Sequence, residues 1–426
     1  MYSAGPLLRA SNLGRLRAMT GLGTPSFWQR DAAELLPRWP TLGEAPRAHV
    51  EVLIIGAGLA GCTAARELVA AGHDVLVVDA QGPGAGASGR NAGFVMLGNA
   101  IEYPEIVATR GRASARALLE LGRRNHREIR GALAERCEHR ACGSLMLAEA
   151  DDPRSVTTLE HAATLLHEDG VALELAPPPS ALAGFARALV IHEDGVVHPG
   201  KLLAALAEGL AGRRARVLAL DDRAGHALLD AGPDHAPIEL AFERVLVCAN
   251  AFSRALVPEL EPWLTPQRAQ VLLTTPTAAL LDRPCYAGWG YDYFRQLDDG
   301  ALLLGGRRHL FFAAEQSGEA EPSDAVQHAL DDYRRLHMPS TADAPVRMRW
   351  AGIMGFSRDG LPLLGPLPGR VRTHVLAGFT GHGLGMALAC GKLVARRMLD
   401  RLDAHELELV QLFDAARAGN SSAAST

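Results

Sequence analysis

The sequence predicts an α/β protein with two domains, and three observations lead to this prediction. A short apolar run from Glu51 to Ile55 is followed by a glycine-rich turn, a helical stretch ending at Gly72 and a second apolar run, which together form a βαβ unit. The same buried-strand pattern returns at residues 243–251 and 373–379. Between residues 264 and 306, aromatic-rich strand patterns alternate with turns, as in an antiparallel sheet. A chain of 426 residues is long enough for both units.

The elements between these anchors follow from periodicity. The pattern predicts helices over residues 104–137, 156–169, 201–213, 323–337 and 386–402, and strands over residues 143–150, 216–222 and 226–232. The first 49 residues lack sustained periodicity, so we expect a surface lead-in that is packed at most by Phe27 and Trp28. We expect the tail GNSSAAST to be disordered.

Composition excludes several classes of protein. The hydrophobic fraction is 48 % and the charged fraction 21 %, which is typical of a folded soluble chain. The net charge of −5 does not favour nucleic acid as a partner. Six scattered cysteines lack the CxxC pairs of a zinc site, and the histidines lack metal-like spacing, so we expect no metal and a reducing, cytoplasmic location.

No apolar run approaches the roughly 18 residues of a membrane span, and the opening segment lacks the apolar core of a secretory signal. The arginines Arg9, Arg15 and Arg17 leave an organelle transit peptide as the alternative to a basic lead-in.

The glycine-rich turn has the spacing of a dinucleotide site. Gly56, Gly58 and Gly61 form G-x-G-x-x-G directly after a strand and at the start of a helix. The first glycine allows the tight turn, the second lets the backbone approach a pyrophosphate, and the third lets helix and strand pack closely. Asp79 ends the second strand, where a carboxylate takes the ribose hydroxyls. The alternative is a glycine-rich turn in another kind of α/β protein.

A second small-residue segment, Gly84 to Gly93, follows almost at once. Small residues let the backbone lie flat against a large planar ligand, and Ser88, Arg90 and Asn91 add hydrogen-bond donors. Taken alone, this segment favours a flexible surface loop.

From about Trp28 to Leu399 the chain resembles the D-amino-acid-oxidase family of FAD proteins. The motifs that carry the resemblance are EVLIIGAGLAG, DVLVVDA, GASGRNAG, GVVHPGKLLAALA, ERVLVCANAFS, RWAGIMGFSRDGLPLLG and LAGFTGHGLGMALACGKLVA. Within the family, the SGRN and GHG motifs and the Asp292–Arg295 segment are most similar to gamma-glutamylputrescine oxidase.

The resemblance implies a Rossmann-like FAD-binding domain assembled from separated stretches, with an inserted α+β substrate domain built on an antiparallel or mixed sheet. We assign residues 50–103, 190–262 and 355–400 to the first domain, and residues 104–189 and 263–354 to the second. Residues 1–49 form the lead-in, and residues 401–426 form a C-terminal helix and tail.

The resemblance also implies how FAD is held. Val217 would hold the adenine through its backbone, Ala249 and Asn250 would line the adenosine, and the segment from Gly381 to Gly385 would meet the pyrimidine end of the flavin. The implied cofactor residues are Gly56, Gly58, Leu59, Ala60, Gly61, Asp79, Ala80, Ala87, Ser88, Gly89, Arg90, Asn91, Ala92, Gly93, Val217, Ala249, Asn250, Gly352, Gly381, His382, Gly383, Leu384 and Gly385.

The implied reaction is oxidation of the C–N bond of an amine, with hydride transfer to flavin N5, hydrolysis of the imine, and reoxidation by O₂ or another acceptor. The candidate catalytic residues are His382, Tyr293 and Met354, and the candidate substrate-binding residues are Trp289, Tyr291, Arg295 and Phe356. Aromatic residues at alternate strand positions are equally explained as core, and a structural ion pair also explains Arg295.

Three departures from the family pattern shape the expected activity. Met354 stands where amino-acid-oxidising relatives carry an arginine that binds the substrate carboxylate, which favours an amine unless Arg295, Arg307 or Arg308 reaches in instead. The segment has no cysteine for a covalent flavin bond, so we expect non-covalent FAD. Leu303 stands where sarcosine oxidases use a lysine to activate oxygen, which leaves a dehydrogenase open.

The sequence thus predicts an FAD-dependent amine oxidase or dehydrogenase. The alternatives are an amino-acid oxidase or dehydrogenase of the same fold, a flavin-dependent tailoring enzyme in a biosynthetic pathway, and a non-catalytic flavin-binding protein.

Overall fold

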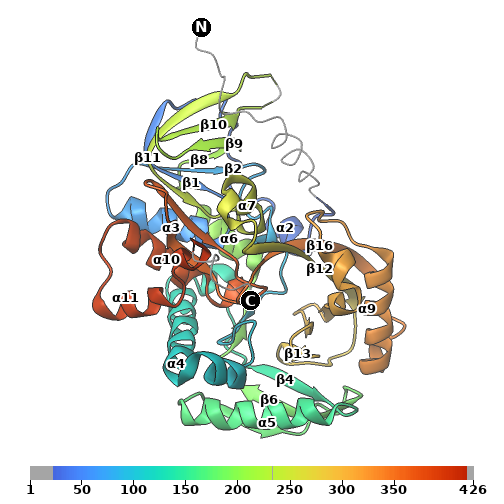
Figure 1. The fold of residues 1–426 in the computed structure, drawn as a ribbon. Helices are drawn as coiled ribbons and strands as arrows, with labels where there is room; N and C mark the ends of the chain where they lie inside the picture. The colour runs from blue at the N-terminus through green and yellow to red at the C-terminus, as the bar shows by residue number, and fades with distance from the viewer. Residues whose placement is uncertain (1–22, 233, 420–426) are drawn as a thin grey trace.

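The computed structural model describes residues 23–232 and 234–419. The arginines of the opening segment and residues 420–426 of the tail lie outside this range. Two large sheets with flanking helices make up the fold, as Figure 1 shows. The predicted α/β class is confirmed.

The first sheet contains the βαβ unit. Its order is β17-β18-β11-β1-β2-β8, and β10 and β9 extend it from β11. β1 runs parallel to both β2 and β11, with Ile55 opposite Val78 and Val247. The strands are β1 (His49–Ile55), β2 (Val75–Asp79), β8 (Gly212–Arg214), β9 (Arg216–Asp221), β10 (His226–Asp230), β11 (Ile238–Val247), β17 (Leu363–Pro366) and β18 (Thr373–Ala377).

Alternation along β1 gives this sheet two buried faces. Val52 and Ile54 pack against α3 (Leu59–Ala70), α10 (Ala387–Met398) and α4 (Tyr103–Arg130). Leu53 and Ile55 face the opposite way, into a core shared with β9 and β10. Both faces are covered, which explains the continuous apolar run in the sequence.

The second sheet has the order β16-β12-β15-β14-β13-β4-β6-β5. Its strands are β4 (Ser144–Glu149), β5 (Leu173–Ala176), β6 (Phe185–Ile191), β12 (Leu264–Pro276), β13 (Cys285–Ala287), β14 (Asp292–Gln296), β15 (Ala301–Gly305) and β16 (Val346–Ser357). Leu272, Leu302 and Leu304 face α9 (Asp324–His337). Val271, Leu303 and other residues of the opposite face pack toward Phe94 and Met96 near the first sheet.

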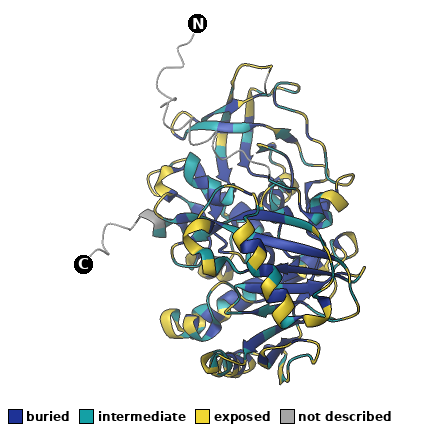
Figure 2. Cartoon of the chain, turned by 90° about the vertical axis from the view of Figure 1, so that its right-hand side faces the viewer, coloured by how far each residue is buried: buried dark blue, intermediate teal, exposed yellow. Residues whose placement is uncertain are grey.

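The remaining elements lie outside the two large sheets. They are α2 (Phe27–Asp31), β3 (Phe94–Val95), α5 (Pro153–Glu168), β7 (Gly195–Val196), α6 (Pro199–Ala207), α7 (Ser253–Leu256), α8 (Phe312–Glu315) and α11 (Ala404–Gln411), with short 3₁₀ turns between them. Among them, β3 and β7 pair as a two-stranded sheet. Figure 2 shows the strands mostly buried and the exposed residues concentrated on helices and loops.

Three predicted helices are too long, and one of them is α10, which ends at Met398 instead of residue 402. α6 ends at Ala207 because Gly209 adopts a left-handed φ of 74°, and residues 212–214 instead join β2 as strand β8. α4 ends at Arg130 and is kinked at Gly111, where φ is 80°.

The lead-in is more integrated than the sequence predicts. Ser26 begins α2 with a reciprocal capping box to Gln29, and Trp28 is buried. Leu42 is buried beneath the first sheet, and Thr41 bridges to Arg214 at the sheet edge. A surface segment packed only by two aromatic residues is therefore the wrong description of residues 23–49.

Candidate functional site

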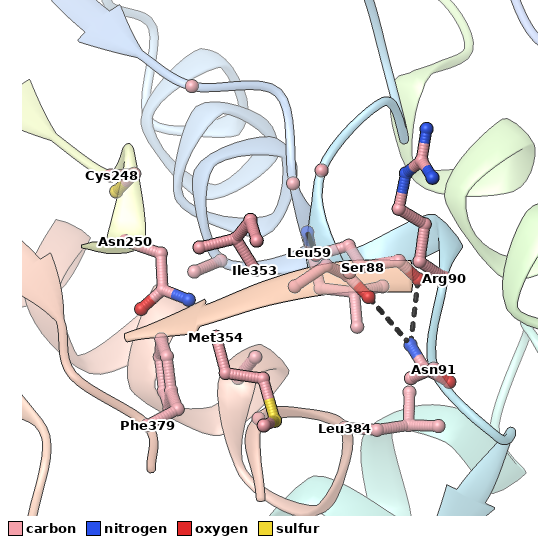
Figure 3. Close-up of a pocket in the computed structure, with 18 of the residues that line it drawn as sticks. Leu59, Ser88, Arg90, Asn91, Cys248, Asn250, Ile353, Met354, Phe379 and Leu384 are labelled. Carbon is pink, nitrogen blue, oxygen red and sulfur yellow. Dashed lines mark hydrogen bonds between the residues drawn. The ribbon is translucent and has the colours of Figure 1, made fainter. Parts of the chain in front are cut away.

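A cavity lies at the carboxyl ends of β1, β2 and β11 and extends to residues of the second sheet. Its volume is about 2250 Å³ including the open mouth, and both sheets and their connecting loops contribute residues. One end is lined by the β1–α3 turn, the end of β2 and β9, and the other by β13, β14, β16 and the segment before α10. Figure 3 shows part of its wall, with Ser88 and Asn91 in one loop and Met354 on β16.

The G-x-G-x-x-G turn forms the floor of the first end. Gly56 has a φ of 112°, and a Cβ there would lie 2.6 Å from the Cys248 carbonyl oxygen. A Cβ at Gly61 would lie 2.0 Å from the Gly56 oxygen, so this position permits close packing of helix on strand. Gly58 is the N-cap of α3. The Ser88 hydroxyl accepts a hydrogen bond from the Leu59 N–H at 3.1 Å, and Gly58, Leu59 and Ala60 line the cavity at the helix N-terminus.

Asp79 lies beside this turn at the end of β2. Its carboxylate accepts hydrogen bonds from the backbone N–H groups of Ala57, Gln81 and Gly82, each at 2.9 Å. Burial raises the pKa of the carboxyl, while these three donors oppose the rise. Asp79 also lines the cavity. The same residue therefore holds the glycine turn and borders the space that is open to a ligand at the end of β2.

The loop of residues 84–93 presents mostly backbone to the cavity. Arg90 donates to the carbonyls of Ala85 and Ala351, each at 2.8 Å. The Asn91 side chain donates to the Ser88 carbonyl at 2.8 Å and accepts from the Gly93 N–H at 2.8 Å, and Figure 3 shows its bonds to the loop. Both side chains thus hold the shape of the loop.

Helix α2 supports this loop from behind. The Ser26 hydroxyl donates to the Gly89 carbonyl at 2.5 Å, the Trp28 indole to the Asn91 carbonyl at 2.6 Å, and the Gln29 amide to the Gly84 carbonyl at 2.8 Å. These contacts leave no local pattern in the sequence, because they join segments about 60 residues apart.

Val217 on β9 and the Ala249–Asn250 turn after β11 line the cavity near Asp79 and the glycine turn. Asn250 adopts a left-handed φ of 46°, and its side-chain oxygen accepts from the Gly378 N–H at 3.1 Å. This bond ties the end of β11 to the segment that leads to residues 381–385.

His382 lies inside the cavity just before α10. Its Nδ1 lies 3.3 Å from the Thr380 carbonyl oxygen, and its ring stacks on Tyr286 at a centroid distance of 6.1 Å. Burial lowers the pKa of His382 to about 4, so the imidazole is neutral at pH 7. Asn125 fixes the following turn by donating to the Leu384 carbonyl and accepting from the Leu388 N–H, each at 2.9 Å.

Met354, Tyr293, Tyr286 and Arg308 line the end of the cavity near His382. Tyr286 and Tyr293 pair across the β13–β14 hairpin and therefore share one face of the sheet. Tyr286 was not among the predicted site residues, although the hairpin register that pairs it with Tyr293 could have indicated it. Arg308 appeared only among three possible substitutes for the missing arginine, since nothing local indicates where its side chain points.

Most of the sequence-derived site residues come together in this cavity. Those that line it are Gly56, Gly58, Leu59, Ala60, Asp79, Ala80, Ala87, Ser88, Arg90, Asn91, Ala92, Val217, Ala249, Asn250, Tyr293, Gly352, Met354, Gly381, His382, Gly383, Leu384 and Gly385. Gly61, Gly89 and Gly93 lie behind it and act through close packing, as the position of Gly61 against Gly56 illustrates.

Four candidate substrate residues lie outside the cavity lining. Arg295 points behind the loop, with Nη1 3.3–3.4 Å from the carbonyl oxygens of Ala92, Gly93 and Val197. Trp289 is 44 % exposed at the tip of the hairpin. Tyr291 and Phe356 contact the Arg308 guanidinium instead. Leu303 is fully buried and packs with Phe94 and Met96 without lining the cavity itself.

The donor set fits FAD. The cavity combines a helix N-terminus for a pyrophosphate, a carboxylate at a strand end for a ribose, and glycine-lined backbone for a planar ring. Gly352 and Gly385 leave close backbone approaches that a Cβ would fill, at 3.1 Å from Arg90 Cβ and 2.4 Å from the Met96 oxygen.

Comparisons with known proteins agree with this assignment. Residues 51–397 match the family model described as FAD dependent oxidoreductase. Gamma-glutamylputrescine oxidoreductase from Escherichia coli is 26 % identical over 409 residues, which cover 89 % of this chain and 91 % of that protein. The crystal structure of glycine oxidase from Geobacillus kaustophilus superposes with a TM-score of 0.70 at 21 % identity, covering 87 % of this chain and 99 % of that chain.

A third relative is a longer protein. The tRNA 5-methylaminomethyl-2-thiouridine biosynthesis bifunctional protein from Burkholderia orbicola is 32 % identical over 451 residues, which cover 93 % of this chain and 66 % of that protein. This chain therefore corresponds to about two thirds of that relative's length.

The described part of the chain contains neither a candidate membrane span nor a candidate metal cluster. Within residues 23–232 and 234–419, no helix is long and apolar enough to cross a membrane. The same residues contain no cluster of three or more histidine, cysteine, aspartate or glutamate side chains that could hold a metal ion.

Proposed function

The chain belongs to the family of FAD-dependent oxidoreductases, and from this premise we propose that it oxidises the C–N bond of a small-molecule amine. The observation that carries the proposal is the single cavity joining the glycine turn and Asp79 at one end to His382, Met354 and two tyrosines at the other. The two relatives whose names include gamma-glutamylputrescine and glycine support this chemistry.

The chain's own residues define how FAD is held. The first turn of α3 and the loop of residues 84–93 take the pyrophosphate, Asp79 the ribose, Val217 the adenine, and residues 381–385 the pyrimidine end. Bound FAD supplies a hydride acceptor for the carbon next to the amine nitrogen, and O₂ or another acceptor then takes up the electrons. Among the six cysteines, Cys248 lines the cavity, and it lies beside Gly56 at the glycine-turn end rather than at the reacting end, which supports non-covalent cofactor binding.

The protein groups around the reacting end are uncharged apart from Arg308. His382 is neutral, and burial raises the pKa of Tyr293 to about 12, so its hydroxyl keeps its proton. Neither group therefore acts as a strong base. The amine binds in its neutral form, because a protonated nitrogen has no lone pair to assist hydride loss. His382 and the tyrosines orient the amine and exclude water.

Two further parts of the proposal concern context. We place the protein in the cytoplasm with a small molecule as its substrate, which its free cysteines and its net charge of −5 support. We also assign cofactor binding to the domain around the first sheet and substrate binding to the domain around the second, because the two ends of the cavity draw on these sheets.

An anaerobic titration tests the proposal. We expect the holoprotein to show the absorbance of oxidised flavin and small amines or amino acids to bleach it. Readmitting air then distinguishes oxygen from another acceptor by whether the colour returns. A protein that takes up no FAD, or a bound flavin that no amine or amino acid reduces, contradicts the proposed function.

A further inference from the structure

Arg308 is an arginine without an acceptor at the reacting end of the cavity. Its Nε is buried and has no hydrogen-bond partner, and no carbonyl, hydroxyl or carboxylate within the described chain accepts a hydrogen bond from its guanidinium. Its contacts are aromatic: the guanidinium carbon lies 4.7 Å from the Tyr291 ring centroid and 5.1 Å from that of Phe356. Such contacts occupy the face of a guanidinium and leave the N–H groups on its edge available.

The neighbouring arginines bind partners elsewhere through their terminal nitrogens, although Nε of Arg295 and of Arg307 also lacks a hydrogen-bond partner. Arg307 pairs with the buried Asp292, Nη1 to Oδ2 at 2.9 Å, and lies over the Tyr333 ring. Arg295 bonds three backbone carbonyls behind the loop of residues 84–93. Among the arginines that line the cavity, Arg90 bonds backbone carbonyls and Arg216 lies on β9 at the opposite end. Arg308 is thus the charged side chain at the reacting end of the described lining.

The guanidinium lies over the part of β16 that carries Met354. Met354 and Phe356 are two residues apart on this strand, so their side chains project from the same face. Arg308 stacks on Phe356 and lines the cavity together with Met354. The segment after β15 therefore brings a positive charge to the wall where Met354 itself offers only a thioether.

This charge limits which amines the site accepts. Burial opposes the charged form of Arg308 and lowers the pKa of its guanidinium, but an arginine remains protonated at neutral pH. A substrate without an anion would leave this charge unpaired in a cavity that its own binding has desolvated. A carboxylate matches the fork of a guanidinium with two parallel hydrogen bonds.

We propose that the substrate is an amine that also carries a carboxylate, and that Arg308 binds this carboxylate at the Met354 wall of the cavity. This inference rests on the proposed C–N oxidation and narrows its substrate class. Arg308 follows β15, whereas the arginine expected from the family pattern would stand on β16, at the position of Met354.

Binding of simple carboxylates to the oxidised holoprotein tests the proposal without turnover. Acetate and benzoate are titrated while the flavin absorbance is followed, with the corresponding neutral amides as probes lacking the charge. We expect the carboxylates to perturb the spectrum and the amides to do so far more weakly. Arg308→Met should weaken carboxylate binding about 10- to 100-fold, and Arg308→Lys should retain part of it.

Two further variants control for folding and charge. Arg335→Met removes one positive charge at an exposed position on α9 and should bind carboxylates as the wild type does. Adding Met354→Arg to Arg308→Met returns a guanidinium to the same wall and should recover binding. Each variant is compared at full FAD occupancy, which its flavin spectrum reports.

The outcomes separate this inference from the proposed function. Equal carboxylate binding by wild type and Arg308→Met overturns the role of Arg308, as does faster flavin reduction by an amine than by the matching amino acid. A flavin that carboxylates perturb through Arg308 but that no amino acid reduces contradicts C–N oxidation and leaves the anion site standing.

Discussion

At the residue scale, the site depends on single groups whose partners the structure identifies. Asp79 accepts three backbone N–H groups and in this way shapes the turn that it also exposes to the cavity. The proposed role of Asp79 in holding a ribose can be separated from its role in the turn by comparing ligands with and without that ribose.

Asp79→Asn should weaken FAD binding about 10- to 100-fold, because an amide removes the charge that accepts the ribose hydroxyls. FMN lacks the adenosine, so its affinity should change little. Titration of the apoprotein with each flavin, followed by flavin fluorescence, measures both affinities. A similar loss for FMN and FAD would mean that Asp79 acts only by supporting the turn.

At the element scale, site residues that lie close together in the sequence could be predicted from their spacing. Gly56, Gly58 and Gly61 stand in one turn between adjacent elements, so their spacing sufficed to place them. Arg308 lies in a turn at the end of β15, and its neighbours Tyr291 and Phe356 come from two other parts of the second sheet. Such long-range packing leaves no periodic signal in the sequence.

The same reasoning explains why α2 was missed. It has only five residues, too few to show helical periodicity, and its capping box is visible only once Ser26 and Gln29 are seen to bond reciprocally. Its polar side chains nevertheless hold the backbone of residues 84–91 from the side opposite the cavity. Helix α2 thus positions the loop without lining the cavity.

Trp28→Phe should lower FAD affinity about 5- to 10-fold, because it removes the indole hydrogen bond to the Asn91 carbonyl while keeping an aromatic ring in the core. Arg30→Ala, an exposed change on the same helix, is the matched control and should leave affinity unchanged. Fluorescence titration with FAD compares the two. Unchanged affinity in Trp28→Phe would show that the loop holds its shape without α2.

At the scale of the whole molecule, buried ionisable groups make stability depend on pH. Burial lowers the pKa of His126, His374 and His382 to about 4 and raises that of Asp194 to about 7. As pH falls from 7 to 5, the unfolded chain takes up protons on its histidines first, which destabilises the fold. Over the same range the folded chain takes up a proton on Asp194 first, which stabilises it.

His126 and Asp194 therefore provide variants with effects of opposite sign. His126 on α4 has its Nδ1 3.0 Å from the Glu193 carbonyl oxygen, while Asp194 accepts from the Leu97 N–H and the Ser144 hydroxyl. Each shift corresponds to about 2 kcal/mol of unfolding free energy between pH 7 and pH 5. His126→Gln should reduce the loss of stability on acidification by this amount, and Asp194→Asn should increase it by a similar amount.

Urea unfolding at pH 7 and pH 5 with excess FAD measures the two differences, and His161→Gln, an exposed change on α5, should follow the wild type. The opposite signs matter because a general weakening of the fold would move both variants in the same direction at both pH values. If both variants kept the wild-type difference between pH 7 and pH 5, the buried histidine and aspartate would not be the groups that couple protonation to folding. Opposite changes of about 2 kcal/mol would instead locate that coupling at the α4 contact with residues 193–194.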